Sequence, residues 1–599
     1  MSRPVPTPCD AQPRFESLED RRLCAAGAPD LSFSGDGRTT VDFLGGLRAF
    51  AADAAVQKDG KTVVVGFVDA GGGTRRFAVA RLNFDGTPDT TFDGDGLVVV
   101  PVGDIGDARA TAVAIQGDGK IVVAGSARVD SFGSFNGPDF AVIRLLPDGR
   151  LDRTFDGDGK RTIDFAGGAT DVALQGDGKI VIVGENFDSG FLGFGGDFNF
   201  AVARLNPSGS LDQSFSGDGK QQIGFSGDDF AEAVAISNNK IIIAGRSGSE
   251  FSSSKMAIVR LNANGSGDTT FGPSGNARVL TSFPGQAVSS ARDLLVQSGG
   301  KIVVAGTSGN PSNPSSMQFA LTRFLSTGAI DTSFGASGSG IVATDMGGND
   351  VGLGIMTSAD GGLIVAGSSE RKFALAGYTA NGVLDARFGN AGKLVTDFGL
   401  LDTTSGIGLA KGTGMRRFVV AGGSQFSTAR FLDANANVVS VGSLDPNAAE
   451  QGRDAASLLV TRTERLPFAT RVFFSIGGTA TGPNGAANRI DYDVAGMDVP
   501  ATAPAFVDIP AGQTFAQVVI TPRDDARREP RETAIFTIQA NAAYVLGTNP
   551  SATASITDND GPGAAGVTAI APRGAGPLGR VVRSLFSANP IDELIAARR

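Results

Sequence analysis

The side chains of this chain that could carry chemistry are mainly carboxylates. Its 599 residues include 62 Asp and Glu against 52 Lys and Arg, a formal net charge of −10, and no His or Trp. Without imidazole, the sequence excludes a Ser-His-Asp triad, a histidine base and histidine-ligated zinc or haem. The acidic balance is a poor match for nucleic acid or anionic lipid, so we expect no nucleic-acid partner. Carboxylate acid–base chemistry and calcium binding remain open.

Two turn motifs place pairs of carboxylates beside glycine. Residues 93–96 and 156–159 both read Asp-Gly-Asp-Gly, as at the start of a calcium loop. No Glu follows at the distance that such a loop requires, and the other units carry Ser, Asn or Ala there. Ordinary turn chemistry is therefore favoured over calcium for these motifs.

One Arg and one Asp recur in nearly every unit of a long internal repeat. An Arg fork can hold a carboxylate in bidentate geometry, so we expect structural pairs that tie an outer strand to the next turn. A ring of ligand contacts is the less favoured alternative. The Arg residues are Arg81, Arg144, Arg204, Arg260, Arg323 and Arg430, with Gly377 in the remaining unit, and the Asp residues are Asp30, Asp89, Asp152, Asp212, Asp268, Asp331 and Asp385.

Two long loops rich in Gly and Phe, at 126–139 and 185–199, interrupt consecutive units of the repeat. Exposed aromatic side chains on neighbouring loops would form an apolar patch of the kind that marks a partner site. The alternative is that these rings pack on one another as a cover. The candidate partner-binding residues are Phe132, Phe135, Phe187, Phe191, Phe194 and Phe198.

The elements that must position these residues follow from the repeat. The tag Asp-x-x-Phe recurs about every 60 residues, at Phe33, Phe92, Phe155, Phe215, Phe271, Phe334 and Phe388. Each unit holds four short runs rich in Val, Ile, Phe and Ala, two of them joined by Asp-Gly or a similar turn. Seven four-stranded units predict a seven-bladed β-propeller over residues 30–438, with a β-solenoid as the alternative.

The repeats closely resemble the delta-60 repeat family. The resemblance rests on LNFDGTPDTTFDGDG (82–96), LLPDGRLDRTFDGDGK (145–160) and QGDGKIVVAG (116–125). It covers about two-thirds of the chain. This family has no well-defined activity, so the resemblance implies little about function.

A different pattern occupies residues 439–560. Its short alternating runs predict an immunoglobulin-like antiparallel β-sandwich, so the whole fold is expected to be all-β. The runs are 457–463, 471–478, 506–510, 515–522, 533–540 and 551–558. The segment resembles a Calx-beta domain in IPAGQTFAQVVITPRDD (509–525) and the terminal ITDND (556–560).

The Calx-beta resemblance implies a calcium site at one end of this domain. Calcium takes six to eight oxygen ligands, mostly from carboxylates. Arg527, Arg528 and Arg531 stand nearby and could neutralise the acidic loop without metal, which is the alternative. The ligands that the resemblance implies are Glu450, Asp491, Asp524, Asp525, Glu529, Asp558 and Asp560.

The two ends differ from the body in composition. Residues 1–29 hold both cysteines, Cys9 and Cys24, and residues 15–23 resemble the LEPR-XLL segment of planctomycete surface proteins, which implies export. A disordered tail is the alternative. Residues 561–599 are expected to form a flexible extension or, alternatively, a docking peptide. No run approaches the length of a transmembrane helix.

These observations predict an extracellular or cell-surface protein that is not an enzyme. Recognition or adhesion would use the propeller loops, the partner would be a surface polymer or protein, and calcium would stiffen the second domain. The alternatives are a carboxylate-based propeller hydrolase or lyase and a passive spacer. A deep central pocket that holds paired carboxylates outside the repeat pattern would favour the enzyme.

Overall fold

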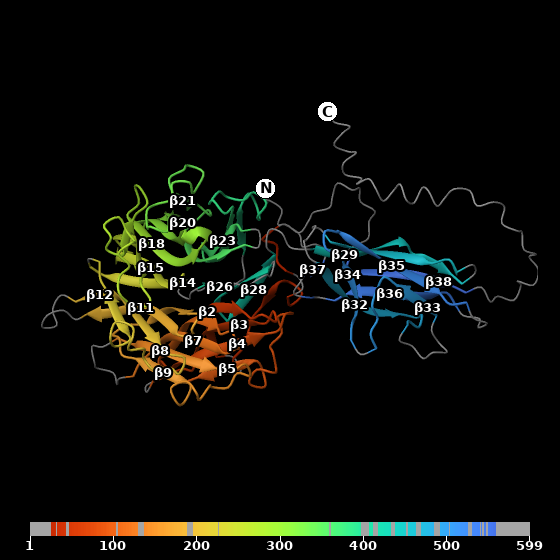
Figure 1. Ribbon diagram of the computed structural model, residues 1–599, viewed down its shortest axis with the longest axis horizontal. Helices are drawn as coiled ribbons and strands as arrows, with labels where there is room; N and C mark the ends of the chain where they lie inside the picture. Colours follow the sequence, from red (N-terminus) through yellow and green to blue (C-terminus); the bar gives the residue numbers. More distant parts are fainter. Residues whose placement is uncertain are drawn as a thin grey trace, which may run out of the picture.

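The computed structural model describes residues 26–558 and consists of β-sheets in two parts, a larger one up to residue 432 and a smaller one from residue 438 (Figure 1). Helical structure in the described residues is limited to the 3₁₀ turn η2 (Ser298–Gly300). No described helix is long and apolar enough to span a bilayer. The stretches within 26–558 that are not described are 31–32, 44–46, 104–105, 130–136, 189–195, 226, 359–360, 397–406, 411–416, 433–437, 451–452, 463–468, 484–490, 502, 525–529, 540, 542–543 and 547–548.

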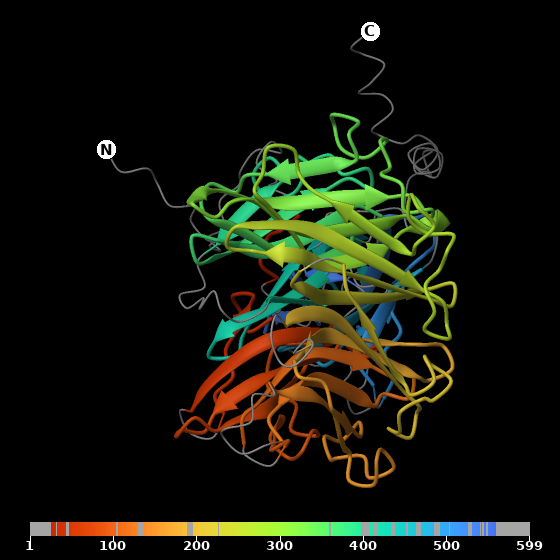
Figure 2. The same cartoon turned by 90° about the vertical axis from the view of Figure 1, so that its left-hand side faces the viewer.

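Five four-stranded antiparallel sheets follow one another in the larger part, each a simple meander (Figure 2). The first two consist of β6 (Ala108–Ile115), β7 (Ile121–Ala127), β8 (Asp139–Leu145) and β9 (Lys160–Ile163), then β10 (Ala169–Leu174), β11 (Ile180–Asp188), β12 (Asp197–Leu205) and β13 (Lys220–Ile223). The other three consist of β14 (Asp229–Ser237), β15 (Lys240–Ser249), β16 (Ser253–Leu261) and β17 (Arg278–Thr281), then β18 (Val288–Val296), β19 (Ile302–Asn310), β20 (Asn313–Phe324) and β21 (Ile341–Thr344), then β22 (Asp350–Thr357), β23 (Leu363–Ser369), β24 (Lys372–Tyr378) and β25 (Lys393–Thr396).

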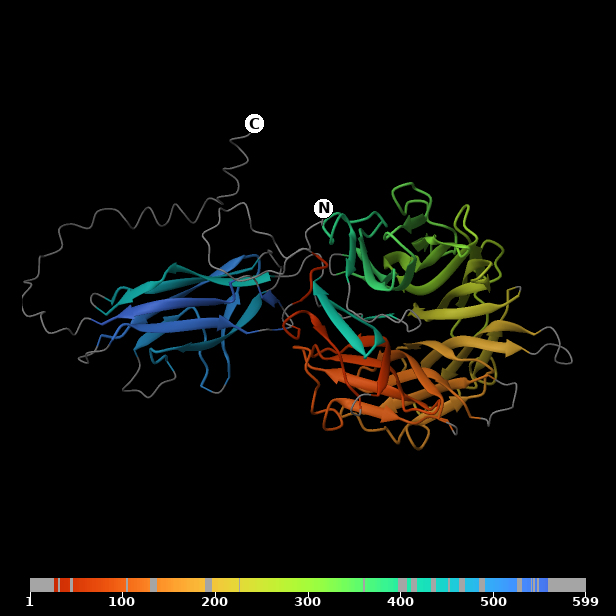
Figure 3. The same cartoon turned by 180° about the vertical axis from the view of Figure 1, so that it is seen from behind.

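The two ends of the larger part meet in one eight-stranded sheet. Its strands are β1 (Arg38–Thr39), β2 (Arg48–Val56), β3 (Thr62–Asp69), β4 (Arg75–Leu82), β5 (Leu97–Val100), β26 (Ile407–Ala410), β27 (Arg417–Ser424) and β28 (Ser427–Leu432). The short β1 pairs antiparallel with β28, Arg38 lying opposite Ala429. The N-terminal strand therefore completes the sheet built by the last strands, and the red and teal ends lie side by side (Figure 3).

The sequence unit and the sheet are out of phase by one strand. The short run after each Asp-x-x-Phe turn, such as β5, is the fourth strand of the sheet that precedes the turn. The recurring Arg, such as Arg81, lies on the third strand, so the prediction that it sits on an outer strand was wrong. The ladder explains this, because the segment 83–96, which contains the Asp-x-x-Phe turn, returns the chain antiparallel to the strand that it has just left.

The apolar core lies between sheets that are neighbours in the sequence. One buried cluster joins Val122 and Phe140 of the β6–β9 sheet to Ile180 and Ala201 of the next sheet, and Phe155 of the connecting turn belongs to it. The same arrangement recurs around the larger part. Each sheet thus buries its two faces against two neighbours, which a single four-stranded sheet cannot do.

The smaller part consists of two five-stranded sheets around one buried cluster. In β31 every second side chain is buried, as expected for a strand with one face on a core. Val460 and Ile520 of one sheet meet Phe474 and Phe536 of the other in this cluster. One sheet has the order β33 (Tyr492–Ala495), β35 (Phe515–Pro522), β31 (Ala456–Arg462), β29 (Val438–Asp445) and β37 (Val545–Leu546), and the other β30 (Asn447–Ala449), β38 (Ser551–Thr557), β36 (Glu532–Ile538), β32 (Thr470–Gly478) and β34 (Ala505–Ile509).

The predicted Arg–Asp pairs are confirmed. In six of them the Arg Nε lies 2.6–2.8 Å from the Asp Oδ2, and the Asp residues are nearly inaccessible. The guanidinium also lies over the Phe ring of the same Asp-x-x-Phe tag, 4.5 Å from its centroid at Arg81 and Phe92. Burial alone would raise the pKa of Asp212, but hydrogen bonds from Ser214 and Lys179 lower it to about 2. Its contribution to stability is therefore present above pH 4 and is lost as the pH falls toward 2.

The same Arg residues connect each sheet to the next one. Arg144 Nη1 donates to the carbonyl of Pro207 at 2.5 Å, and Arg323 Nη1 donates to that of Ala380 at 2.9 Å; each carbonyl belongs to the turn after the third strand of the following sheet. Arg430 on β28 donates in the same way to Phe84, which follows β4. One guanidinium thus holds the strand, the turn and the neighbouring sheet.

We expect Arg144→Ala to lower the free energy of unfolding by roughly 3–5 kcal/mol, because it leaves the Asp152 carboxylate buried without its main partner. The matched control is Arg387→Ala, which removes an Arg–Asp pair whose Arg side chain is 62% exposed and should cost at most about 1 kcal/mol. Urea unfolding of both variants measures the difference. Equal costs would show that the buried pair does not hold the sheets together.

Candidate functional site

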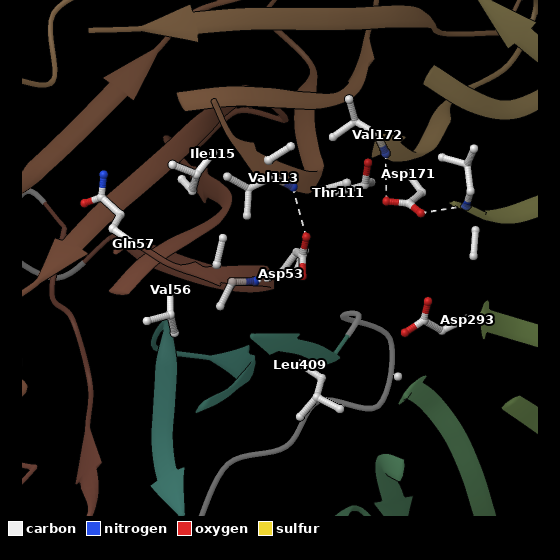
Figure 4. A pocket seen from close by; sticks show the side chains of 18 of the residues that line it. Asp53, Val56, Gln57, Thr111, Val113, Ile115, Asp171, Val172, Asp293 and Leu409 are labelled. Atoms are coloured by element: carbon white, nitrogen blue, oxygen red, sulfur yellow. Dashed lines mark hydrogen bonds between the residues drawn. The ribbon is translucent and has the colours of Figure 1, made fainter. Parts of the chain in front are cut away.

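A central pocket of about 1150 Å³ lies where the first strands of the sheets come together (Figure 4). Its lining is mostly small and apolar, as at Ala52, Ala114, Val351 and Leu409. Charged side chains enter it from only some strands. The pocket therefore combines small apolar residues with many charged and polar ones, so it can offer hydrogen bonds as well as apolar contact to a ligand.

Three aspartates in the pocket join neighbouring sheets. Each follows a β-bulge in the first strand of its sheet. Asp53 accepts from the backbone N–H of Ala54 at 2.8 Å and, with its other oxygen, from that of Val113 in the next sheet at 2.9 Å (Figure 4). Asp171 and Asp293 bind the next sheets in the same way. These carboxylates are structural acceptors for backbone donors.

A different cluster occupies the pocket wall at the β11, β14, β15 and β18 strands. Glu232 and Arg292 are the bulged residues of β14 and β18, where the earlier sheets carry Ala52, Thr111 and Thr170. The bulge directs both side chains into the pocket. Glu250 also lines the pocket. Glu185 and Arg246 do not line it but complete the Glu/Arg cluster, which we define as Glu185, Glu232, Arg246, Glu250 and Arg292.

Ion pairs hold four members of the Glu/Arg cluster in a chain. Glu232 Oε1 accepts from Arg246 Nη1 at 2.9 Å and from Arg292 Nη1 at 2.7 Å. Arg292 Nη2 donates to Glu250 Oε2 at 2.7 Å. The Nε atoms of Arg246 and Arg292 are buried and have no hydrogen-bond partner among the described residues. Two N–H donors of the cluster therefore have no acceptor among the described residues.

Glu185 stands out because of its protonation. Burial raises its pKa to about 7, and the charge of Glu232 adds to this, while the Gly168 backbone N–H and Arg246 act against it. Burial likewise lowers the pKa of Arg246, whereas the charge of Glu232 raises that of Arg292. Glu185 does not itself line the pocket, but a carboxyl whose pKa is shifted this far by burial and a neighbouring charge is a candidate functional group.

A row of aromatic rings leads from the surface to the Glu/Arg cluster. The rings of Phe187 and Phe198 lie 5.2 Å apart, and Phe198 stacks on Phe230 at 5.0 Å. The Arg246 guanidinium lies 4.0 Å from the Phe230 centroid. Phe187 is 37% exposed, and Phe251, next to Glu250 in the turn after β15, is 83% exposed.

The predicted aromatic site is described only in part. Phe187 and Phe198 are cross-strand partners on β11 and β12 and belong to the row above. The other four candidates lie outside the described residues. They are Phe132, Phe135, Phe191 and Phe194.

The residues expected to bind calcium lie partly in the described region. Register places Glu450 and Asp558 next to each other, because each directly follows the aligned pair Ala449–Thr557 of the parallel strands β30 and β38. Glu450 is 5% exposed, and Asp491 accepts from the Thr481 backbone N–H. Asp524 also lies in this region, whereas Asp525, Glu529 and Asp560 are outside it. No group of three or more acidic side chains close enough to hold a metal occurs within the part of the chain that the structure covers.

The Asp-Gly-Asp-Gly turns behave as turns. Gly94 and Gly96 adopt φ values of 93° and 91°, and Asp95 Oδ1 accepts from the Leu97 backbone N–H at 2.9 Å. Asp93 also adopts a positive φ, of 51°. The prediction of ordinary turn chemistry agrees with this geometry.

Sequence reasoning missed the Glu/Arg cluster, although a signal was present. Of 11 Glu in the chain only four lie within residues 30–438, and three of these four form the cluster. Glu185 and Arg246 both directly follow the Gly in the third run of consecutive units, and Glu232 and Arg292 share the bulge position. Charge at positions that are otherwise mostly small or uncharged would have marked the site.

The comparison with protein families identifies the repeat. A model described as a domain of unknown function (DUF5122), beta-propeller, matches residues 57–92, 116–155, 175–215, 236–271 and 297–334. These five stretches are similar to that family, and the larger part of the chain has a β-propeller fold. No curated protein matches the chain.

Several solved structures resemble the chain at low identity. They include the polysaccharide lyase Uly1 (10% identity, TM-score 0.39, covering 69% of this chain and 98% of that one) and extracellular domains 1–2 of Drosophila Semaphorin 1a (10%, 0.33, 65% and 87%). CBD12 from CALX1.2 also matches (17%, 0.15, 20% and 44%), so the chain spans less than half of that protein.

The prediction that the protein is not an enzyme is corrected by these comparisons. Two of the similar propeller structures are polysaccharide lyases, one of them an ulvan lyase, so this architecture does not exclude catalysis. The similarity is too low to assign an activity to this chain.

We expect Glu185→Gln to remove a pH dependence of stability. The carboxyl has a pKa of about 7 in the folded protein against 4.5 in the unfolded chain, so its stabilising contribution is complete below pH 4.5 and is lost as the pH rises through 7. Relative to the wild type, the variant should therefore gain up to about 3 kcal/mol between pH 4.5 and pH 8. Thermal melting across this range measures it, with Glu370→Gln as the control for loss of a carboxylate outside the pocket. Parallel pH profiles of wild type and Glu185→Gln would contradict the assignment.

Proposed function

We propose that this is an exported recognition protein of the cell surface or extracellular matrix, whose seven-bladed propeller binds its ligand at the central pocket. The seven blades would be the five four-stranded sheets, β2–β5, and β26–β28 completed by β1. The observation that carries the proposal is that Glu232 and Arg292, charged residues where the bulges in the other first strands carry uncharged ones, lie together with Glu250 on one wall of the pocket. A scaffold built only for support would keep the same residues at equivalent positions all around.

The distribution of polar groups supports a binding role for that wall. Asp53, Asp171 and Asp293 already satisfy backbone donors across three sheet boundaries. The Glu/Arg cluster adds charge at positions where Thr or Ala suffices elsewhere. Glu250 and Arg292 keep 33% and 24% of their side-chain surface exposed, so a ligand in the pocket could reach both.

Catalysis on the bound ligand is a second candidate, favoured by one observation. Glu185, with a pKa of about 7, could donate or accept a proton next to Glu232, which pairs with two arginines. Carboxylate pairs of unequal pKa perform hydrolysis and elimination in other proteins. Glu185→Gln would then retain ligand binding and lose turnover, which separates this candidate from recognition alone.

We further propose that the smaller part is a calcium-binding β-sandwich of the Calx-beta type. Its support is where four of the predicted ligands lie along the strands. Glu450, Asp524 and Asp558 follow the ends of β30, β35 and β38, and Asp491 directly precedes β33, which pairs with the end of β35. Carboxylate oxygens are the ligands that calcium prefers. Glu450 and Asp558, which lie next to each other, would hold the ion together with the predicted ligands outside the described residues.

A ligand panel tests the recognition proposal. We expect the wild-type chain to bind at least one member of combined glycan, peptide and matrix-protein arrays, and Glu250→Gln to lose that binding because it removes an accessible acceptor of the pocket. Glu370→Gln is the matched control and should bind as the wild type does. A wild-type chain that binds nothing, or binding that Glu250→Gln leaves unchanged, would support a passive spacer instead.

Calcium should raise the melting temperature of the smaller part. At a concentration 100 times the dissociation constant, binding adds about 2.7 kcal/mol to the free energy of unfolding. Calorimetry of the full chain with and without millimolar calcium measures the shift, which Glu450→Gln should abolish. Asp508→Asn removes an exposed ion pair with Arg471 on the same part and should keep the shift. A melting temperature indifferent to calcium would refute the metal site.

A further inference from the structure

We propose that the Glu/Arg cluster and the aromatic side chains beside it form a binding site for a neutral oligosaccharide. This inference rests on the proposed recognition function and names the chemical class of its ligand. Three features of the site carry it: exposed aromatic surface, neighbouring acceptors and donors, and a pocket larger than a single small ligand needs.

The aromatic surface lies on the turn and the hairpin that flank the cluster. Phe251 is 83% exposed, although it directly follows Glu250, whose carboxylate is fixed by Arg292 at 2.7 Å. Phe251 therefore offers an accessible apolar ring beside a fixed charged group. Phe187 offers a second partly exposed ring, at the end of the row that reaches Arg246. Flat apolar rings suit the C–H faces of sugar rings.

The Glu/Arg cluster offers both partners that a hydroxyl needs. A hydroxyl donates one hydrogen bond and accepts others, whereas a carboxylate only accepts and a guanidinium only donates. Glu250 and Arg292 present these two groups side by side and partly exposed.

The charge of the cluster argues against ionic ligands. An anion would have to displace Glu232 or Glu250 from the arginines, and a cation would have to displace the arginines from the carboxylates. Either exchange breaks ion pairs of partly buried groups, which is strongly unfavourable. Neutral hydroxyls can join the existing network without breaking it.

The cluster also links neighbouring sheets, but that role does not require all of its members. The Glu232–Arg292 pair alone joins β14 to β18, as Thr170 joins β10 to β14 by donating to the Ala231 carbonyl at 2.9 Å. Glu250 adds a partly exposed carboxylate, although the Glu232–Arg292 pair already joins β14 to β18. The pocket volume of about 1150 Å³ exceeds the usual range for single small ligands, which fits several linked sugar units.

Isothermal titration of the full chain tests the ligand class. The neutral probes are cellohexaose, maltohexaose, mannohexaose and xylohexaose, and the charged probes are hexagalacturonate and a chitosan hexamer. We expect at least one neutral probe to bind, and Phe251→Ala to weaken it about tenfold, the loss of one aromatic contact. Phe515→Ala is the matched control, because Phe515 is a 42% exposed aromatic residue of the other part and should leave binding unchanged. Melting temperatures of both variants confirm that they fold.

The outcomes separate this inference from the function on which it rests. Binding of only the charged probes, or of only a peptide or protein in the panel, would overturn the assignment to a neutral oligosaccharide and leave recognition standing. Binding of a neutral probe that Phe251→Ala and Glu250→Gln do not weaken would place the saccharide elsewhere and overturn this site. Failure of every probe and of the whole panel would overturn both.

Discussion

The larger part depends on a guanidinium that recurs in six of its seven repeat units and satisfies three demands together. Its Nε holds a nearly inaccessible aspartate, its plane covers the Phe of the same turn, and its Nη1 reaches a carbonyl of the following sheet. A lysine at the start of the second strand adds a second cation, as Lys179 does at 3.1 Å from Asp212. Since a buried carboxylate is tolerated only with such partners, each turn, its strand and its neighbour must assemble as one unit.

The β22–β25 sheet lacks this guanidinium and shows which contacts take its place. Gly377 stands at the Arg position, and Phe388 fills the space, because a Cβ at Gly377 would lie only 2.5 Å from its ring. Asp385 is held instead by Arg387, two residues along, through a local fork. In the eight-stranded sheet, where the two ends of the larger part meet, an additional guanidinium is present. Arg417 takes the lysine position, pairs with Asp30 and donates to the Asn541 carbonyl at 2.9 Å, so the closing sheet is also tied to the smaller part.

Sequence reasoning could reach whatever is local or repeated. The strands, the glycine turns and the Arg–Asp pairs follow from patterns within about 60 residues, and the structure agrees with them. Closure by β1 could not be read in this way, because Arg38 and Ala429 meet across nearly the whole repeat region and two residues carry little pattern. The Glu/Arg cluster was missed for a related reason. Glu232 faces the pocket only because of the bulge in β14, which is seen in the pairing of β14 with β15 and not in the sequence.

The location of the cluster follows from how the repeat uses its inner strands. The residue after each bulge is committed to the scaffold wherever it is Asp, since its two oxygens bind backbone donors of two sheets. The bulged residue itself is less constrained, being Ala52 in β2 and Thr111 in β6. The residue after the Gly of the second strand is similarly variable. Charge placed at these two positions alters the pocket wall while Asp171 and Asp293 still join their sheets. A rigid repeat can therefore carry one specific site at little cost to the interactions that close it.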